Sequence, residues 1–290
     1  MIQSSKTYIL TASCAGRSGT VDVVTRFLRE SGCYITELNS FDDALGHRFF
    51  IRAVFRKEDS SVLDQVTFCS SFASRAEEFE MDWELTPSDY RPKVVIMVSK
   101  YDHCLNDLLY RFRTGNLAVD IKAVISNHPD LESLAQWHDI PYYHFPITAE
   151  TKPQQEAQVQ AVLEQTGCEL LVLARYMQVL SHEMCVRWAG KAINIHHSLL
   201  PGFKGAKPYH QAYKKGVKLV GATAHYVSDD LDEGPIITQG MDTVDHTYYP
   251  ADLARKGMDV ESLTLARAIQ YHIEKRVFLF NDKSVVFERS

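Results

Sequence analysis

The 290-residue sequence predicts an α+β domain followed by an α/β domain. In residues 1–85, β-rich and helical segments follow one another in the order βαββαβ, which is typical of two helices on one antiparallel sheet. From residue 94 to residue 290, short apolar runs alternate with helical patterns, which indicates a mostly parallel sheet with helices on both faces. Between these parts, the stretch "TPSDYRPK" (86–93) has two prolines and several polar residues and is expected to be a linker.

The first domain is expected to have the ferredoxin-like arrangement, an order of elements known as a split βαβ unit. Gly32 follows the first helical pattern directly and suits the C-cap of that helix. Val62, Val66, Cys69 and Ala73 recur at helical spacing and mark the second helix, whose apolar face they are expected to form. The strands and helices are expected in the order "TYILTA" (7–12), "TVDVVTRFLRES" (20–31), "CYITELNSF" (33–41), "HRFFIRAVF" (47–55), the helix around 62–73, and "MDWEL" (81–85).

The second domain is expected to be Rossmann-like, because buried parallel strands appear as short continuous apolar runs. In such sheets ligands bind beyond the carboxyl ends of the strands, and the polar sequence "NIHHS" (194–198) follows a strand at such a place. A later stretch, residues 218–239, is expected to form two strands joined by a tight acidic loop. The strands before it are expected at "KVVIMVS" (93–99), "DIKAVIS" (120–126), "PYYHFPI" (141–147), "CELLVLARY" (168–176) and "KAINIHH" (191–197).

Composition limits the classes of function. A net charge of −6 argues against broad capture of a polyanion, so no nucleic acid partner is expected. The six cysteines are scattered without a CxxC pair, which favours reduced thiols in the cytoplasm over a disulfide framework. The N-terminus lacks the pattern of a signal peptide, and no apolar run approaches the roughly 20 residues that span a bilayer. We therefore expect a soluble, cytoplasmic protein with no membrane partner.

Two kinds of catalytic site are disfavoured by the local sequence. His196, His197 and Asp232 offer enough ligands for zinc, but no HExxH motif or nearby cysteine supports a metal site. Ser198 and Cys185 have no GxSxG-type motif that would support covalent catalysis. Successive side chains of an extended segment point in opposite directions, so Asn194 and His196 are expected to share a face while His197 faces elsewhere.

Three stretches, "VLARYMQVL" (172–180), "INIHHSLLPGFKG" (193–205) and "GATAHYVSDDLDEGPII" (221–237), closely resemble the folate-dependent formyltransferase family over residues 93–280. The resemblance implies a formyltransferase domain with a catalytic Asn-x-His pair and an aspartate. The matching catalytic residues are Asn194, His196 and Asp232. The residues that the resemblance implies for folate binding are Met177, Gln178, Leu180, Ser228, Asp229 and His225.

Residues 13–41, "SCAGRSGTVDVVTRFLRESGCYITELNSF", resemble ACT regulatory domains. This resemblance implies either an amino-acid effector site or an assembly module, and both alternatives stay open. Gly16, Gly19 and Asn39 are the candidate regulatory residues. Ser18 stands where these domains more usually have a proline.

The two domains together resemble the formyltetrahydrofolate deformylases over nearly the whole chain. The implied reaction is hydrolysis of 10-formyltetrahydrofolate to formate and tetrahydrofolate, with water as the formyl acceptor, no metal and no tightly bound cofactor. The segment "MVSKYDHCLNDLLYRF" (97–112) has no glycine-rich loop for a phosphate, which disfavours a nucleotide amine as acceptor. The alternatives are formyl transfer to an amine of the glycinamide ribonucleotide type, and a non-catalytic folate or amino-acid sensor. The family resemblance and the exposed sheet edges favour a homo-oligomer.

Overall fold

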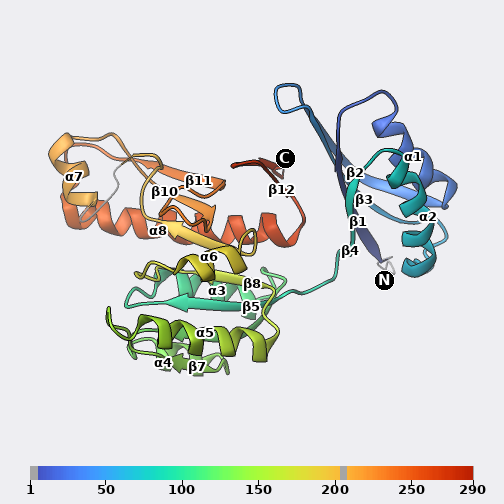
Figure 1. The fold of residues 1–290 in the computed structure, drawn as a ribbon. Helices are drawn as coiled ribbons and strands as arrows, with labels where there is room; N and C mark the ends of the chain where they lie inside the picture. Colours follow the sequence, from blue (N-terminus) through green and yellow to red (C-terminus); the bar gives the residue numbers. More distant parts are fainter. Residues whose placement is uncertain (1–5, 203–207, 290) are drawn as a thin grey trace. The chain divides into compact units, whose positions relative to one another are not determined.

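The computed structural model describes residues 6–202 and 208–289 and separates the chain into two compact units (Figure 1). The first unit comprises Met1–Tyr90, Glu274–Phe278 and Phe287–Ser290. The second comprises Arg91–Ile273 and Leu279–Val286. The sequence analysis assigns residues 274–278 and 287–290 to the second domain, whereas their contacts group them with the first unit. Residues 203–205 of the "INIHHSLLPGFKG" stretch lie outside the described residues.

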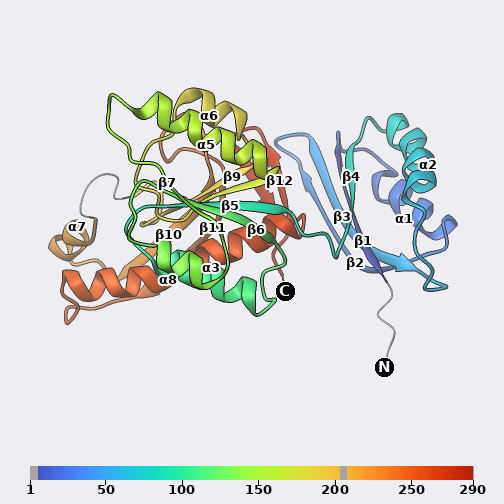
Figure 2. The ribbon, with the colours of Figure 1, turned by 90° about the horizontal axis from the view of Figure 1, so that it is seen from below.

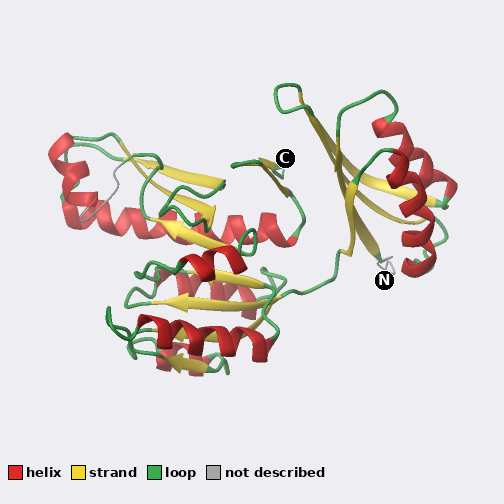
Figure 3. Cartoon of the chain, in the orientation of Figure 1, coloured by secondary structure: helices red, strands yellow, loops and turns green. Residues whose placement is uncertain are grey.

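The first unit has the predicted βαββαβ order and a four-stranded sheet in the order β2-β3-β1-β4. The pairs β2–β3, β3–β1 and β1–β4 are all antiparallel, and both helices cover one face of the sheet (Figure 3). Gly32 takes the left-handed conformation after the first helix, as expected of a C-terminal cap. The elements are β1 (Thr7–Cys14), α1 (Thr20–Glu30), β2 (Cys33–Asp43), β3 (Arg48–Lys57), α2 (Gln65–Glu78) and β4 (Asp82–Pro87).

The buried face predicted for the second helix is wrong. Val62 and Val66 have exposed fractions of 71% and 78%. Helix α2 begins only after Asp64, whose side chain accepts hydrogen bonds from two backbone N–H groups of the first turn. The face that packs on the sheet is shifted toward the larger aromatic rings, which bury more apolar area. It consists of Phe68, Phe72 and Ala76.

The opposite face of this sheet carries a buried ionic network. The Glu37 carboxylate accepts hydrogen bonds from Arg52 at 2.8 Å and from Arg276 at 3.0 Å. The two arginine side chains are only 3% and 4% exposed. Burial alone would raise the pKa of Glu37, but the two guanidinium groups lower it on balance. Residues near the C-terminal end of the chain are thereby fastened to the first unit.

The second unit is built on a seven-stranded sheet in the order β11-β10-β9-β8-β5-β6-β7. The strands from β9 to β7 are parallel, and β10 pairs antiparallel with both β9 and β11. Helices α5 and α6 lie on one face of the sheet, and α3 and α8 lie on the other (Figure 2). The strands are β5 (Lys93–Val98), β6 (Asp120–Ser126), β7 (Tyr142–His144), β8 (Leu170–Leu173), β9 (Ala192–His196), β10 (Leu219–Tyr226) and β11 (Ile236–Thr243).

Helices connect and cover these strands as an α/β fold requires. The described part of the chain has no helix that combines the length and the apolar character needed to cross a bilayer. The helices of this unit are α3 (His103–Arg113), α4 (Glu132–Trp137), α5 (Lys152–Thr166), α6 (His182–Arg187), α7 (Pro208–Lys215) and α8 (Pro250–Ile273). Strands β12 (Val277–Phe280) and β13 (Lys283–Val286) form a separate two-stranded sheet.

The register of the central strands determines where polar groups gather. Leu173, the last residue of β8, pairs with Asn194 of β9, and His225 of β10 pairs with Asn194 from the other side. Two pairs further along, His196 pairs with Thr223. Directly paired residues bring their side chains close together on one face of the sheet. The carboxyl ends of β8 and β9 thus meet the histidine of β10 at one edge.

Candidate active site

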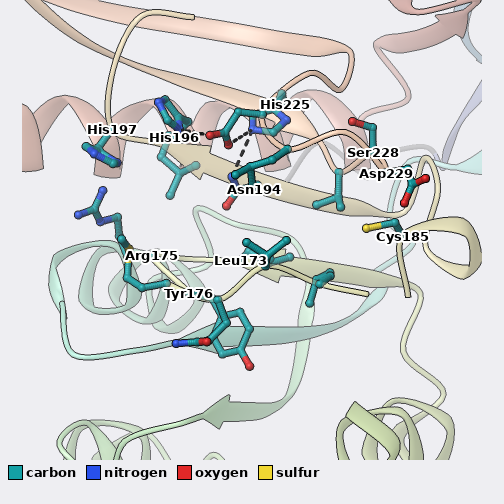
Figure 4. Close-up of a pocket in the computed structure, with 18 residues that line it drawn as sticks. Leu173, Arg175, Tyr176, Cys185, Asn194, His196, His197, His225, Ser228 and Asp229 are labelled. Carbon is teal, nitrogen blue, oxygen red and sulfur yellow. Dashed lines mark hydrogen bonds and ion pairs between the residues drawn. The ribbon is translucent and has the colours of Figure 1, made fainter. Parts of the chain in front are cut away.

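A cavity of about 250 Å³ lies at the carboxyl ends of β8 and β9, closed by the loop between β10 and β11 (Figure 4). It brings together every residue that the resemblance implies for catalysis and folate binding, although these come from three separate stretches. The lining includes Met177, Gln178, Leu180, Asn194, His196, His225, Ser228, Asp229 and Asp232. Gly234 lets the acidic loop turn back, since a Cβ there would lie 1.8 Å from the carbonyl oxygen of Tyr226.

His196 and Asp232 form an ion pair in this cavity. His196 Nδ1 lies 3.1 Å from Asp232 Oδ2, and the two side chains are 7% and 16% exposed. Burial raises the pKa of Asp232, but hydrogen bonds from His196 and His225 lower it by more, so the pKa lies far below its usual range. The Asp232 backbone has a φ of 59°, in the left-handed region that aspartate tolerates better than most residues. Asp232 is therefore an ionised hydrogen-bond acceptor.

The partners of His196 indicate that its ring carries both protons. The Ser198 hydroxyl donates its one proton to the carbonyl oxygen of Gly202 at 3.0 Å. It must therefore accept from His196 Nε2, which lies 3.0 Å away. The Asp232 carboxylate can only accept, so Nδ1 also donates. A doubly protonated imidazole cannot act as a base toward Ser198, which agrees with the absence of a nucleophilic serine motif.

Asn194 is held by His225. His225 Nδ1 lies 2.9 Å from the carbonyl oxygen of Tyr226, to which it donates. Its Nε2 lies 3.2 Å from Asn194 Nδ2 and 3.6 Å from Asp232 Oδ1. The amide oxygen of Asn194 points away from the imidazole (Figure 4). His225 therefore contacts the two other polar groups of the site and controls how the Asn194 amide is turned.

The expectation that His197 faces elsewhere is wrong. Its ring stacks on that of His196 with centroids 4.9 Å apart, and His197 lines the same cavity. The alternation of an extended strand does not apply, because β9 ends at His196. Burial, assisted by the nearby charges of Arg175 and His196, lowers the pKa of His197 to about 4. His197 is therefore a neutral ring beside a charged one.

A buried network that was not predicted from the sequence adjoins Arg175, which lines the cavity. Glu261, which is 1% exposed on α8, lies 2.7 Å from His103 Nε2, 2.8 Å from the Tyr209 hydroxyl and 3.4 Å from Arg175 Nε. Burial raises the pKa of Glu261, but its hydrogen bond with His103 and the charge of Arg175 lower it on balance. One signal was present in the sequence, since Arg175 interrupts an otherwise apolar run, "LLVLARYM". The position of Glu261 gives no such signal.

One group of three potential metal ligands occurs in the described part of the chain. His103, Cys104 and Glu261 place ligand atoms within 4.8 Å of one another. Burial raises the pKa of the Cys104 thiol far above its usual range, and a protonated thiol is a poor ligand. Glu261 already accepts from two donors. The donor set therefore fits a hydrogen-bonded network better than a zinc site.

The three candidate regulatory residues lie in the first unit. Gly16 and Gly19 occupy the loop between β1 and α1, and Gly19 has a φ of 90°. A Cβ on Gly16 would lie 2.6 Å from Asp42 Oδ1. Asn39 lies on β2 opposite Arg52, and its Oδ1 atom is buried without a hydrogen-bond partner among the described residues. The catalytic candidates lie in the second unit.

Comparison with known proteins gives a consistent family. The model of the formyl transferase family matches residues 92–269. A formyltetrahydrofolate deformylase from Corynebacterium sp. (strain P-1) is 49% identical over 280 residues, covering 96% of this chain and 97% of that protein. The crystal structure of a formyltetrahydrofolate deformylase from Pseudomonas putida KT2440 is 64% identical with a TM-score of 0.91, covering 97% of this chain and all of that one. Glycinamide ribonucleotide transformylase 1 from Symbiobacterium toebii is 28% identical with a TM-score of 0.64, covering 68% of this chain and 95% of that one.

Proposed function

We propose that the chain, which belongs to the formyl transferase family and within it to the formyltetrahydrofolate deformylases, hydrolyses 10-formyltetrahydrofolate to formate and tetrahydrofolate. The observation that carries the catalytic assignment is the cavity in which Asn194, His196 and Asp232 converge. The amine-acceptor alternative is not favoured, because the glycinamide ribonucleotide transformylase covers only 68% of this chain, whereas the two deformylases cover 96% and 97% of it. A pure sensor would have no need of a preorganised ion pair beside a hydrogen-bonding amide.

The reaction needs charge stabilisation and proton transfer. Water attacks the formyl carbon, a C–O bond forms, and the carbonyl oxygen of the tetrahedral intermediate becomes negative. Protonated His196 stabilises this negative charge, and the Asp232 carboxylate holds His196 in its charged form. Asp232 also accepts a proton from the attacking water, directly or through a second water molecule. The C–N10 bond then breaks, and N10 takes up the proton that Asp232 received from water. The formic acid formed loses its remaining hydroxyl proton to solvent and leaves as formate.

Asn194 takes part in this mechanism through its amide group. To donate to the oxyanion, the amide must present its nitrogen to the cavity and turn its oxygen toward His225. The amide must therefore be turned relative to its orientation in the structure, where its Nδ2 atom lies 3.2 Å from His225 Nε2. We therefore expect His225 to act as the positioning residue for Asn194, in addition to lining the cavity.

The folate is expected to bind at the side of the cavity formed by the 177–180 segment and the acidic loop. Met177, Gln178, Leu180, Ser228 and Asp229 line this side. Such a mixture of apolar walls and backbone polar groups suits a flat heterocycle with several hydrogen-bonding edges. The substrate is bound only during turnover, and no resident cofactor is required by the residues present.

The first unit is proposed to regulate or assemble the enzyme. The buried Oδ1 of Asn39, which has no hydrogen-bond partner among the described residues, supports a small polar ligand such as an amino acid. Strand β2 is an edge strand with exposed Tyr34, Leu38 and Phe41, which supports a homo-oligomer formed by pairing of two copies. All six cysteines are free thiols, which supports a cytoplasmic location.

A single acceptor-free assay tests the proposed function. The purified chain is mixed with 10-formyltetrahydrofolate without any amine, and formate and tetrahydrofolate are measured. Equal amounts of the two products are expected. If no formate appears in this assay, but a second reaction with added glycinamide ribonucleotide formylates that amine, the transferase alternative is correct. If folate binds and neither reaction occurs, the sensor alternative is correct.

A further inference from the structure

Arg175 is a buried arginine that the proposed mechanism does not use. Its side chain is 8% exposed and lines the catalytic cavity. Its Nε and Nη1 atoms are buried and donate no hydrogen bond to any described residue. Buried N–H groups without acceptors are costly, and they are more so when they belong to a charged group. We therefore expect the Nε and Nη1 donors of Arg175 to bind a ligand.

The surroundings hold the guanidinium in place without using its donors. The ring of Tyr101 lies 4.9 Å from the Arg175 guanidinium carbon, which stabilises the cation on one side. Glu261 Oε2 lies 3.4 Å from Nε, close enough for attraction but without the alignment of a hydrogen bond. His197, whose pKa is lowered to about 4, adds no competing positive charge. Among the described residues, the Nε and Nη1 donors of the guanidinium therefore have no acceptor that would compete with a small anion.

The backbone of Arg175 supports the same conclusion. Its φ is 64°, in the left-handed region that a long side chain seldom adopts. This conformation turns the chain sharply after β8 and directs the side chain toward His197 (Figure 4). Unfavourable backbone conformations of this kind persist where the surrounding structure imposes them, commonly at functional sites.

From these observations we propose that Arg175 forms a carboxylate-binding subsite that receives the formate product. This inference rests on the proposed hydrolysis, in which the neutral formyl group becomes a carboxylate when the C–N10 bond breaks. Arg175 and His197 lie at the opposite side of the cavity from Ser228 and Asp229, with Asn194 between them (Figure 4). Formate can therefore move from the reacting centre to Arg175 while tetrahydrofolate still occupies the folate side. A guanidinium binds a carboxylate through two parallel N–H···O bonds.

A second carboxylate is available in this reaction, because the folate substrate carries a glutamate tail. A tail bound to Arg175 would make this residue part of substrate binding rather than product release. The experiment must therefore separate the two sources of the same chemical group. Formate alone, and a substrate that lacks the glutamate, are the probes that do so.

The first arm measures binding of sodium [13C]formate by NMR to the full chain saturated with tetrahydrofolate. We expect Arg175→Met to weaken formate binding about tenfold or more, which corresponds to loss of a charge-assisted pair of hydrogen bonds. Arg175→Lys should retain part of the affinity, because it keeps the charge but loses the planar fork. Arg187→Met, which removes an arginine that is 55% exposed on α6, is the matched control and should bind formate like the wild type. Equal formate affinity of the wild type and Arg175→Met would overturn the proposal.

The second arm compares KM for 10-formyltetrahydrofolate with KM for 10-formyltetrahydropteroate, which has no glutamate. The ratio of KM in Arg175→Met to KM in the wild type should be the same for both substrates. A raised ratio only for the glutamate-containing substrate would assign Arg175 to the tail and overturn the formate assignment. Tetrahydrofolate binding by each variant shows that it is folded. Absence of formate release by the wild type would refute the proposed function, whereas normal release with unaltered formate binding by Arg175→Met would refute only this inference.

Discussion

Replacing Asp232 with asparagine tests the centre of the proposed mechanism. The substitution keeps the size of the side chain and removes the charge that lies 3.1 Å from His196 Nδ1. Two unit charges at that distance attract by about 5 kcal/mol at an effective dielectric constant of about 20, before desolvation is subtracted. Since each 1.36 kcal/mol of barrier is a factor of ten, about 10⁴ is the upper limit of the loss in kcat. General acid–base catalysis of this kind usually contributes about 10²–10⁴, so we expect a loss within that range.

The assay is formate release without an amine, combined with tetrahydrofolate binding measured by protein fluorescence. Asp230→Asn is the matched control, because Asp230 is an exposed aspartate of the same loop and lies outside the cavity lining. Asp232→Asn should bind tetrahydrofolate nearly as well as the wild type, whereas Asp230→Asn should retain both binding and turnover. Undiminished kcat in Asp232→Asn would refute the catalytic role. A loss of binding as large as the loss of kcat would show that Asp232 only supports the pocket.

The pKa of Asp232 gives this prediction a further consequence. Because that pKa is held far below its usual range, the stability contributed by the carboxylate is present above about pH 4 and is lost only as the pH falls through the lowered value. Asp232 therefore stays ionised throughout the range in which the enzyme is assayed. Any loss of activity between pH 7 and pH 5 must come from another group, and it should have the same midpoint in the Asp230→Asn control.

Three further predictions concern other residues. Asn194→Ala should lower kcat about 10²–10³-fold by removing an oxyanion donor, with Asn116→Ala as an exposed control, and an unchanged kcat would exclude Asn194 from transition-state stabilisation. The free energy of unfolding should decrease by at most about 3 kcal/mol as the pH falls from 6.5 to 4. In this range His197 takes up a proton in the unfolded chain but not in the folded chain, where its pKa is about 4. His197→Gln should remove this component of the pH dependence. Glu37→Ala should lower the free energy of unfolding by at most about 3 kcal/mol, because the buried Arg52 would lose its carboxylate partner and Arg276 would keep only Glu274. The exposed Glu77→Ala should have almost no effect, and equal urea midpoints for the two variants would contradict this role of the network.

Patterns within single segments predicted much of the fold. The segment "HRFFIRAVF" (47–55) was predicted to be a strand, and Ile51, Ala53 and Phe55 of β3 do lie in the core of the first unit. The buried face of α2 was predicted wrongly, because the pattern included Val62, which precedes the start of the helix at Gln65. Periodicity indicates that a helix exists, but the residue at which the helix begins determines which side chains share its buried face.

The catalytic candidates came from the resemblance to the formyltransferase family, and the spacing of two of them has a local meaning. Asn194 and His196 are two residues apart on one strand, so they necessarily share a face. His197 was misjudged because no local pattern showed that β9 ends at His196. Glu261 could not be predicted from local sequence, since α8 brings it to Arg175 only through tertiary packing. Alternation along a strand is a local property, whereas the surroundings of a buried charge depend on elements distant in sequence.

The arrangement of charges around the cavity explains how one site can serve both the neutral substrate and the charged intermediate. His196 is paired with Asp232, and Arg175 lies close to Glu261, so each cation has a neighbouring carboxylate before the reaction begins. A formamide group that enters meets a site with little net charge. When water attacks, the oxyanion forms next to His196, which Asp232 already holds in place, so this cation needs no reorganisation. The site therefore stabilises the transition state more than the substrate, which is the condition for catalysis.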